Sequence, residues 1–379
     1  MTDYLDCNAT TPVDPRVQAE ILRYLELEFG NAASPHEFGT RAKAAVQSAR
    51  DRVGAVVAAR RHEVFFTSGA TESNNLALLG LAQHGTDCGK RHIVSTQIEH
   101  RAVLEPLAEL SRRGFEVTLV PPDRGGRVAA RTVLDAIRPD TLLVSLMHVN
   151  NETGVAQPVA ETADALAAEA VFFHVDAAQG FGKDIEPLRH PRIDLISVSG
   201  HKIYGPKGVG ALVVRRRGGE LPPLRPLQFG GGQELGLRPG TLAVPLIAGL
   251  GAAAELALAE WAQRAEQCGR IRGRLLSALA CLSPVVHGDP RFTLPHVLNL
   301  SLPGVDSEEA IAALESVAAV SNGSACTSVC ATGSHVLAAM GVPPRQIDGA
   351  LRLSWCHATE LANLEPMIAI LRRLQRGSP

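Results

Sequence analysis

The sequence lacks a strong excess of charge of either sign. Its 379 residues contain 37 lysines and arginines against 39 aspartates and glutamates, which gives a net charge of −2 at pH 7. This balance argues against a broad nucleic-acid-binding surface, so we expect no direct binding of nucleic acid. Hydrophobic residues make up 45% and charged residues 20% of the chain. That composition is typical of a globular protein and excludes a disordered chain or a fibrous repeat.

Paired cysteines and long apolar runs are also missing. None of the cysteines forms a CxxC pair, and they are odd in number, at positions 7, 88, 268, 281, 326, 330 and 356. We therefore expect a reduced, cytoplasmic setting. The N-terminal MTDYLDCNATTP has acids and turn formers where a secretory signal needs a basic start and an apolar stretch. The longest apolar segment, 242–259, is interrupted by Pro245 and Glu255, so we expect a packed helix and no membrane contact.

From Glu63 onward, strand-like runs alternate with segments of helical periodicity. The strand-like runs are 64–68, 92–96, 117–120, 142–149, 171–176, 195–199 and 210–215. Helix-like segments such as 101–114 and 159–170 lie between them. This alternation predicts an α/β fold with a mainly parallel, seven-stranded sheet covered on both faces.

The rest of the chain predicts a second, smaller unit. An alanine-rich helical stretch at about 242–282 leads to three strand-like runs that alternate with helix-like segments, at 296–302, 317–326 and 349–355. This pattern is typical of an α+β domain, and the length of the chain also favours two domains. A cleft between two such domains is a natural binding site.

Polar residues follow several of the predicted strands directly. They are Ser68 to Thr71, Glu99 and His100, Asn150 to Glu152, Asp176 with Gln179, and Ser199 to Lys202. Open α/β sheets bind their ligands at the carboxyl ends of the strands. The sequence therefore predicts that these side chains converge on one rim of the sheet.

The first of these strand ends has the character of an anion site. FTSGATESNN, residues 66–75, places small residues and Gly69 between a strand and a helix. Free N–H groups at the helix start, with the hydroxyls of Ser68 and Thr71, would suit a phosphate. An ordinary helix capped by serine or threonine has the same appearance, so both interpretations stay open on this motif alone.

Asp176 and Lys202 suggest a cofactor that carries a ring nitrogen and an aldehyde. A carboxylate at the end of the buried run VFFHVD needs a cationic or hydrogen-bonding partner, which a pyridinium nitrogen or the next turn would supply. A partly desolvated lysine at a strand end can form a Schiff base with an aldehyde. Alternatively Lys202 or Lys207 contacts a nucleotide phosphate, but GPKGVG lacks the Ser or Thr that follows the lysine of a P-loop.

Several motifs in this order closely resemble those of the cysteine desulfurases, which are pyridoxal-phosphate enzymes of the class V aminotransferase fold. The motifs are TSGATESNN, IEHRAV, MHVNNETG, HVDAAQ, SGHKIYGPKG and SNGSACTS. The resemblance begins at LDCNATTP and ends at LRLSW, so it covers essentially the whole chain. It implies a large cofactor-binding domain at 14–261 and a small domain formed by 1–13 and 262–379, which carries the catalytic cysteine.

The resemblance also implies the residues that hold pyridoxal 5'-phosphate. Lys202 would be the Schiff-base lysine, and His100 would stack on the ring and is our candidate for proton transfer, with stacking alone as the alternative. The other implied cofactor contacts are Ala70, Thr71, Asn151, Asp176, Gln179, Ser199 and His201, and Thr241 from the neighbouring subunit of a homodimer. We expect no metal site.

The implied reaction converts L-cysteine to L-alanine and leaves its sulfur as a persulfide on Cys326, for delivery to an acceptor protein. Arg352 would bind the substrate carboxylate through two hydrogen bonds, with Asn31 and Asn151 as further substrate contacts. Cys330 lies four positions beyond Cys326 and either accepts sulfur or packs as an ordinary thiol. Cys356 is interpreted as a packing residue.

Two departures from the family pattern affect these expectations. FGNAASPHEFG lacks the proline that often follows the asparagine, which weakens the placement of Asn31 and His36. The chain also lacks the longer C-terminal extension of the desulfurases that serve iron–sulfur assembly. It resembles a desulfurase dedicated to DNA phosphorothioation, and we take that pathway as a hypothesis.

Three other functions stay open at this point. A pyridoxal-phosphate aminotransferase or lyase has the same scaffold but does not need Cys326. A sulfur donor for iron–sulfur cluster assembly uses the same chemistry with another acceptor. A noncatalytic iron–sulfur scaffold would need four ligands, and the spacing of Cys326, Cys330 and Cys356 matches no ferredoxin pattern.

Overall fold

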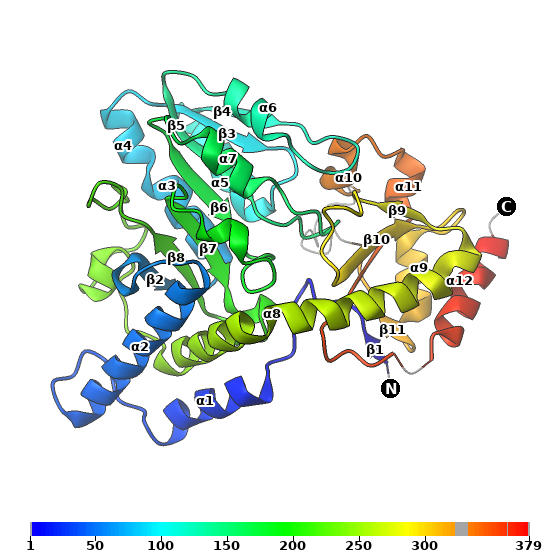
Figure 1. Ribbon diagram of the computed structural model, residues 1–379, viewed down its shortest axis with the longest axis horizontal. Helices are drawn as coiled ribbons and strands as arrows, with labels where there is room; N and C mark the ends of the chain where they lie inside the picture. Colours follow the sequence, from blue (N-terminus) through cyan, green and yellow to red (C-terminus); the bar gives the residue numbers. More distant parts are fainter. Residues whose placement is uncertain (1, 323–332, 362, 378–379) are drawn as a thin grey trace.

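The chain folds into a large and a small unit that are joined along one long helix, as the computed structural model in Figure 1 shows. The structure describes residues 2–322, 333–361 and 363–377. Residues 3–5 pack with the small unit before the chain enters the large one, and the C-terminal helix returns to the small unit. The cofactor site predicted from the sequence lies where these units meet.

The large unit is built on one sheet of seven strands. In their order across the sheet they are β2 (Val64–Thr67), β8 (Gly210–Val214), β7 (Leu195–Ser199), β6 (Phe172–Asp176), β5 (Thr141–Met147), β3 (His92–Thr96) and β4 (Glu116–Val120). All neighbouring pairs are parallel except those of β8, which is antiparallel to both β2 and β7. The predicted mainly parallel seven-stranded sheet is thus confirmed.

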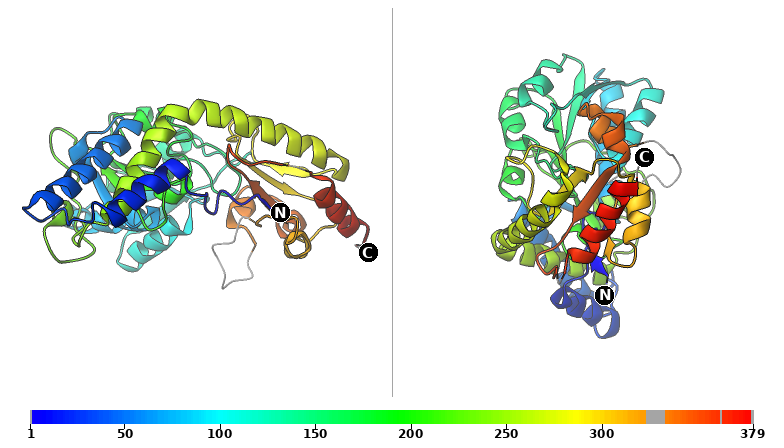
Figure 2. Two further views of the ribbon diagram at one scale, coloured as in Figure 1. Left: turned by 90° about the horizontal axis from the view of Figure 1, so that it is seen from below. Right: turned by 90° about the vertical axis from the view of Figure 1, so that its right-hand side faces the viewer.

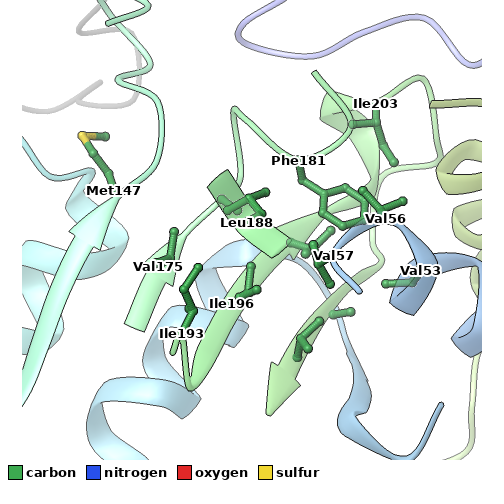
Figure 3. Packing of buried hydrophobic residues seen from close by; sticks show 14 of the residues in the cluster. Val53, Val56, Val57, Met147, Val175, Phe181, Leu188, Ile193, Ile196 and Ile203 are labelled. Carbon is green, nitrogen blue, oxygen red and sulfur yellow. The ribbon is translucent and has the colours of Figure 1, made fainter. Parts of the chain in front are cut away.

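Alternate residues of these strands pack on opposite faces of the sheet, as the two-residue period of a strand requires. Phe66 and Ile196 belong to a large hydrophobic cluster on one face, part of which Figure 3 shows. Their neighbours Phe65 and Leu195 belong to a separate cluster on the other face. Burial on both faces explains why the strands are nearly continuous apolar runs in the sequence.

Helices cover both faces of this sheet. They are α1 (Pro15–Glu26), α2 (Glu37–Val56), α3 (Ala70–Gly80), α4 (Ala82–Asp87), α5 (Arg101–Arg112), α6 (Ala130–Asp135) and α7 (Val159–Ala165). α3 and α5 contribute Leu76, Leu78 and Leu107 to the second cluster, whereas α2 contributes Val46 and Val53 to the first.

The helix α8 (Val244–Leu279) runs along both units, as Figures 1 and 2 show. Its N-terminal half packs on α1 and α2, and its C-terminal half contributes Cys268, Ile271 and Leu275 to the core of the small unit. By length and composition alone it could cross a membrane, but half of its apolar window is buried inside the protein. This is the packed helix expected at 242–282.

The small unit contains two short sheets and its own hydrophobic cluster. Its elements are β9 (Val285–His287), β10 (Val297–Ser301), β12 (Ala350–Ser354), β1 (Asp3–Tyr4), β11 (Ala318–Ala319), α9 (Ser307–Leu314), α10 (His335–Ala339), α11 (Pro344–Asp348) and α12 (Glu365–Gly377). β12, β10 and β9 form an antiparallel sheet, and β1 pairs in parallel with β11. The apolar side chains of α10 pack with the large unit instead. The boundaries 14–261 and 262–379 stay a prediction.

Candidate active site

The ends of several strands surround one cavity of about 540 Å³. Side chains from the turn after β2, from His100, from the ends of β6 and β7, and from Arg352 of β12 line it. Residues 8–10 of the N-terminal segment close another side. The structure therefore brings together most of the polar rim predicted from the sequence, with one wall supplied by the small unit. Glu99, Asn150 and Glu152 of that prediction are buried and do not line the cavity.

The turn between β2 and α3 presents the start of a helix to this cavity. Gly69 has a φ of +157° and precedes α3, and no side chain caps this helix among the described residues. Gly210 of β8 packs so closely that a Cβ on it would lie 2.6 Å from the Cα of Gly69. Ala70 and Thr71 line the cavity, so backbone N–H groups are available there for an anion.

Asp176 is buried at the end of β6 and is held in a fixed orientation. Its Oδ2 accepts a hydrogen bond of 2.8 Å from Asn74 Nδ2, and its Oδ1 accepts one of 2.9 Å from the backbone N–H of Ala178. Gln179 donates from Nε2 to the carbonyl of Asn8 at 2.9 Å. Sequence reasoning did not identify Asn74 as an orienting partner, although it lies in the TSGATESNN motif.

The amine of Lys202 lies beside the N-terminal segment. Its Nζ donates to the carbonyl oxygens of Asn8 and Ala9, the latter at 2.7 Å. Lys202 follows β7 in a short 3-10 turn, Gly200–Lys202, and lines the cavity. Sequence reasoning missed these two carbonyl acceptors, because a backbone contact across more than 190 residues has no side-chain signature.

His100 caps α5 and is held as a neutral imidazole. Its Nδ1 accepts a hydrogen bond of 3.1 Å from the backbone N–H of Ala102. Burial lowers the pKa of His100, with Lys202 acting in the same direction and Asp176 in the opposite one. Because Nδ1 is an acceptor, the neutral ring carries its proton on Nε2.

Four other predicted residues also line the cavity: Ser199, His201, Asn151 and Arg352. His201 Nδ1 lies 3.2 Å from Thr10 Oγ1, and burial lowers the pKa of His201 to about 4, so the ring is neutral at pH 7. The buried guanidinium of Arg352 donates to Asp6 Oδ1 at 2.8 Å and to the carbonyl of Asn151 at 3.1 Å. These two contacts orient it at the cavity wall.

Three predicted residues are not in this group. Asn31 and Thr241 are exposed and are absent from the cavity lining of their own chain. Asn31 Oδ1 instead accepts a local hydrogen bond of 3.0 Å from Ala33 N. Cys326, like Cys330, lies outside the described residues. A contact of Thr241 with a partner subunit stays a prediction, as does the role of Asn31.

Glu99, next to His100 in the sequence, is a wholly buried carboxyl group at this rim. Its Oε1 accepts hydrogen bonds from Met147 N at 2.9 Å and from Thr96 Oγ1 at 2.8 Å. Its Oε2 has no hydrogen-bond partner among the described residues. Burial, the main cause, raises the pKa of Glu99 from 4.5 to about 8. The carboxyl group is therefore mostly neutral at pH 7.

This carboxyl group gives a testable pH dependence of stability. Between pH 4.5 and 8, Glu99 binds more protons in the folded protein than in the unfolded chain. The stability that protonated Glu99 contributes is therefore lost as the pH rises through this window. Glu99→Gln mimics the neutral form. We expect it to remove the loss in free energy of unfolding that deprotonation of Glu99 causes in wild type, which is up to about 4 kcal/mol. Urea unfolding of wild type and Glu99→Gln at pH 5 and 9 measures the change in free energy of unfolding between the two pH values. Glu63→Gln controls for replacing a buried glutamate, and equal pH slopes in wild type and Glu99→Gln would contradict the prediction.

The comparisons with known proteins agree with this geometry. The family model for aminotransferase class V matches residues 3–367, so the chain belongs to that family. It is 42% identical to human cysteine desulfurase over 99% of this chain and 83% of that protein. Within the family this chain is a cysteine desulfurase.

Two solved structures are also similar. DndA from Streptomyces lividans is 52% identical, with a TM-score of 0.82 over 92% of this chain and 98% of that chain. SspA in complex with cysteine is 35% identical, with a TM-score of 0.83 over 93% of this chain and 98% of that chain. The class V family implies pyridoxal phosphate as the cofactor.

The residues of the cavity fit that cofactor. The buried amide oxygens of Asn8, Asn74 and Gln179 line the cavity or its edge and have no hydrogen-bond partner among the described residues. Such unpaired polar atoms are costly unless a polar ligand satisfies them. An uncapped helix start, a fixed carboxylate and an amine at the same cavity match the phosphate, ring nitrogen and aldehyde of pyridoxal phosphate.

Proposed function

We propose that this cysteine desulfurase transfers sulfur from L-cysteine to Cys326 as a persulfide and delivers it for DNA phosphorothioate modification. The likeness to DndA, at 52% identity over 92% of the chain, supports this pathway most directly. Identity to human cysteine desulfurase is lower, at 42%. The likeness to SspA in complex with cysteine supports cysteine as the substrate.

The chain would hold its cofactor through residues that are already oriented. Backbone N–H groups at the start of α3, with Thr71, Ser199 and His201, would bind the phosphate. Asp176, fixed by Asn74, would hold a protonated ring nitrogen. When bound, pyridoxal phosphate supplies an aldehyde that combines with amines and a ring that withdraws electrons from the atoms attached to it.

Substrate binding would use both units. Arg352 of the small unit would bind the carboxylate of cysteine, since its guanidinium is oriented by Asp6 and by the carbonyl of Asn151. Before it could combine with the cofactor, the amine of Lys202 would have to leave the carbonyl oxygens of Asn8 and Ala9. Neutral His100 carries a proton on Nε2, so it would donate that proton first and accept one afterwards.

The sulfur step would belong to Cys326. Its thiolate supplies the electron pair for a new sulfur–sulfur bond, while the carbon–sulfur bond of the substrate breaks. The carbon takes up a proton, so that one enzyme thiol and one cysteine give one enzyme persulfide and one alanine without an external oxidant. A free thiol with a pKa near 8.5 is only a few per cent ionised at pH 7, so a neighbouring cation or base would assist it.

We also propose a homodimer in which Thr241 contacts the cofactor phosphate of the neighbouring subunit. Thr241 is exposed in the single chain. Large apolar side chains are exposed in the preceding segment as well, with Phe229 89% and Leu235 76% accessible. Burial of these side chains against a second copy would remove apolar surface from water and so favour association.

Isotope tracing tests the pathway. Cells that carry or lack the gene receive cysteine labelled with ³⁵S, and the label is counted separately in DNA, RNA and protein. We expect deletion to remove the label from DNA, and the wild-type gene, but not the Cys326→Ala gene, to restore it. Unchanged DNA label, with loss from RNA or from iron–sulfur proteins, would contradict the phosphorothioation pathway and favour another acceptor.

A further inference from the structure

Ser334 and His335 are both bound to the large unit. They come soon after residues 323–332, which include Cys326 and lie outside the described part of the chain. We propose that Glu152 and Ser334, together with His335, are positioning residues that fix the chain on the C-terminal side of Cys326 at the cofactor cavity. They would set the rate of sulfur transfer without taking part in cysteine binding. This inference rests on the proposed role of Cys326 as sulfur acceptor.

The first contact joins Ser334 to Glu152. Ser334 Oγ donates a short hydrogen bond to Glu152 Oε2, and it accepts one of 3.0 Å from the backbone N–H of Leu337. Both residues are buried, at 4% and 3% exposure. The same hydroxyl therefore caps α10 and binds the large unit. Glu152 directly follows Asn151, which lines the cavity.

The loop that carries Glu152 is itself rigid. Asn150 Oδ1 accepts hydrogen bonds of 2.9 Å from the backbone N–H groups of Glu152 and Thr153. Asn150 Nδ2 donates to the carbonyl of Ile98 at 3.1 Å, which connects this loop to the segment before His100. Burial raises the pKa of Glu152, whereas His335, Arg352 and Arg101 act in the opposite direction.

The second contact joins His335 to the residue before His100. His335 Nε2 lies 3.0 Å from the carbonyl oxygen of Glu99. The two anchors thus reach the two loops, at 98–100 and 150–152, whose neighbouring residues line the cavity. Neither Ser334 nor His335 lines the cavity, so their contacts act on the chain and not on the substrate.

Apolar packing adds to these hydrogen bonds. Val336, Leu337 and Met340 are buried in the hydrophobic cluster of the large unit. The sulfur of Met340 lies so close to Gly126 that a Cβ on this glycine would approach it to 3.2 Å. α10 is therefore docked on the large unit, although it lies in the sequence between β11 and β12 of the small unit.

The chain before Cys326 has its anchor in the other unit. Ser321 exchanges backbone hydrogen bonds with Arg352, at 3.2 Å and 2.6 Å. Described residues on the two sides of Cys326 are thus anchored in different units. Ser321 binds the proposed carboxylate-binding arginine, whereas Ser334 and His335 bind Glu152 and Glu99. Seven residues, 327–333, lie between Cys326 and Ser334. Loss of the anchor on the C-terminal side would lower the effective concentration of the thiol at the substrate.

Ser334→Ala tests this inference, with Ser307→Ala as a control for a buried serine at a helix start in the small unit. In a single turnover we expect Ser334→Ala to form the Cys326 persulfide about tenfold more slowly, a size typical of lost positioning. The KM for cysteine and the cofactor absorbance change on adding cysteine should stay within twofold of wild type. In the apoenzyme of Ser334→Ala, iodoacetamide should alkylate Cys326 severalfold faster than in the wild-type apoenzyme.

His335→Ala provides a second variant if Ser334→Ala does not fold, and the same results are expected of it. Wild-type rates of persulfide formation and alkylation in a folded variant would overturn the inference, as would a KM that rises in step with the fall in kcat. If wild-type enzyme produces alanine but no persulfide on Cys326, the proposed function itself fails. The two failures are distinguishable because the second appears in the wild type.

Discussion

Lys202→Ala is expected to lower the rate of alanine formation from cysteine by at least about a thousandfold, which corresponds to more than about 4 kcal/mol of the activation barrier. Lys202 lies in the 3-10 turn that follows β7, and it lines the cavity. Asp176, at the end of the neighbouring strand β6, lines the same cavity. In the proposed mechanism, loss of the amine would remove the covalent link to the cofactor and a base at the reacting carbon. Alanine is measured by chromatography after incubation with cysteine.

The covalent link has its own readout. Borohydride reduction of the holoenzyme, followed by mass spectrometry of peptides, should find the cofactor on Lys202 in the wild type and on no peptide in the variant. Lys207→Ala is the matched control, because Lys207 lies a few residues beyond Lys202 and lines the same cavity, and its loss should leave the link on Lys202 intact. Activity of Lys202→Ala near that of wild type would exclude the proposed chemistry.

Cys326→Ala is expected to reduce alanine formation by at least about a hundredfold while leaving cysteine binding intact. In the proposed mechanism the thiol would take part only in breaking the carbon–sulfur bond, so its loss should lower kcat and not raise KM. With ³⁵S-cysteine, the wild type should carry label on the peptide of Cys326, and the variant should carry none. The absorbance change of the cofactor on adding cysteine should persist in the variant.

Cys330→Ala is the control, because it removes a thiol only four positions away. It should keep alanine formation within a few-fold of wild type. If Cys326→Ala releases alanine at the wild-type rate, the sulfur leaves without an enzyme thiol. The protein would then act as a lyase on the same scaffold, which was the main alternative from the sequence.

The large sheet could be predicted strand by strand because burial on both faces makes each strand a short apolar run. The position of the site followed from the same pattern, since Asp176, Ser199 and Lys202 each end or directly follow a strand. Their orienting partners did not follow from it. Asn74 acts through a side chain from a helix, and the acceptors of Lys202 are backbone carbonyls of the N-terminal segment.

Other parts of the arrangement have no local sequence signal. The docking of α10 on the large unit depends on packing between segments far apart in the chain, so strand and helix patterns do not reveal it. The exposed positions of Asn31 and Thr241 also have no local sequence signal. In the proposed homodimer a second copy would contribute to the site, and neither composition nor periodicity encodes the surface of that copy.

The helix α8 has a consequence for how this protein can change over evolutionary time. Its 36 residues span about 54 Å without interruption and contribute to the cores of both units. A single inserted residue in its middle would rotate everything beyond it by about 100° and shift it by about 1.5 Å. Arg352, which belongs to the small unit, would then move away from the residues of the large unit that line the cavity. Insertions and deletions should therefore accumulate in surface loops, while the number of residues in α8 stays constant.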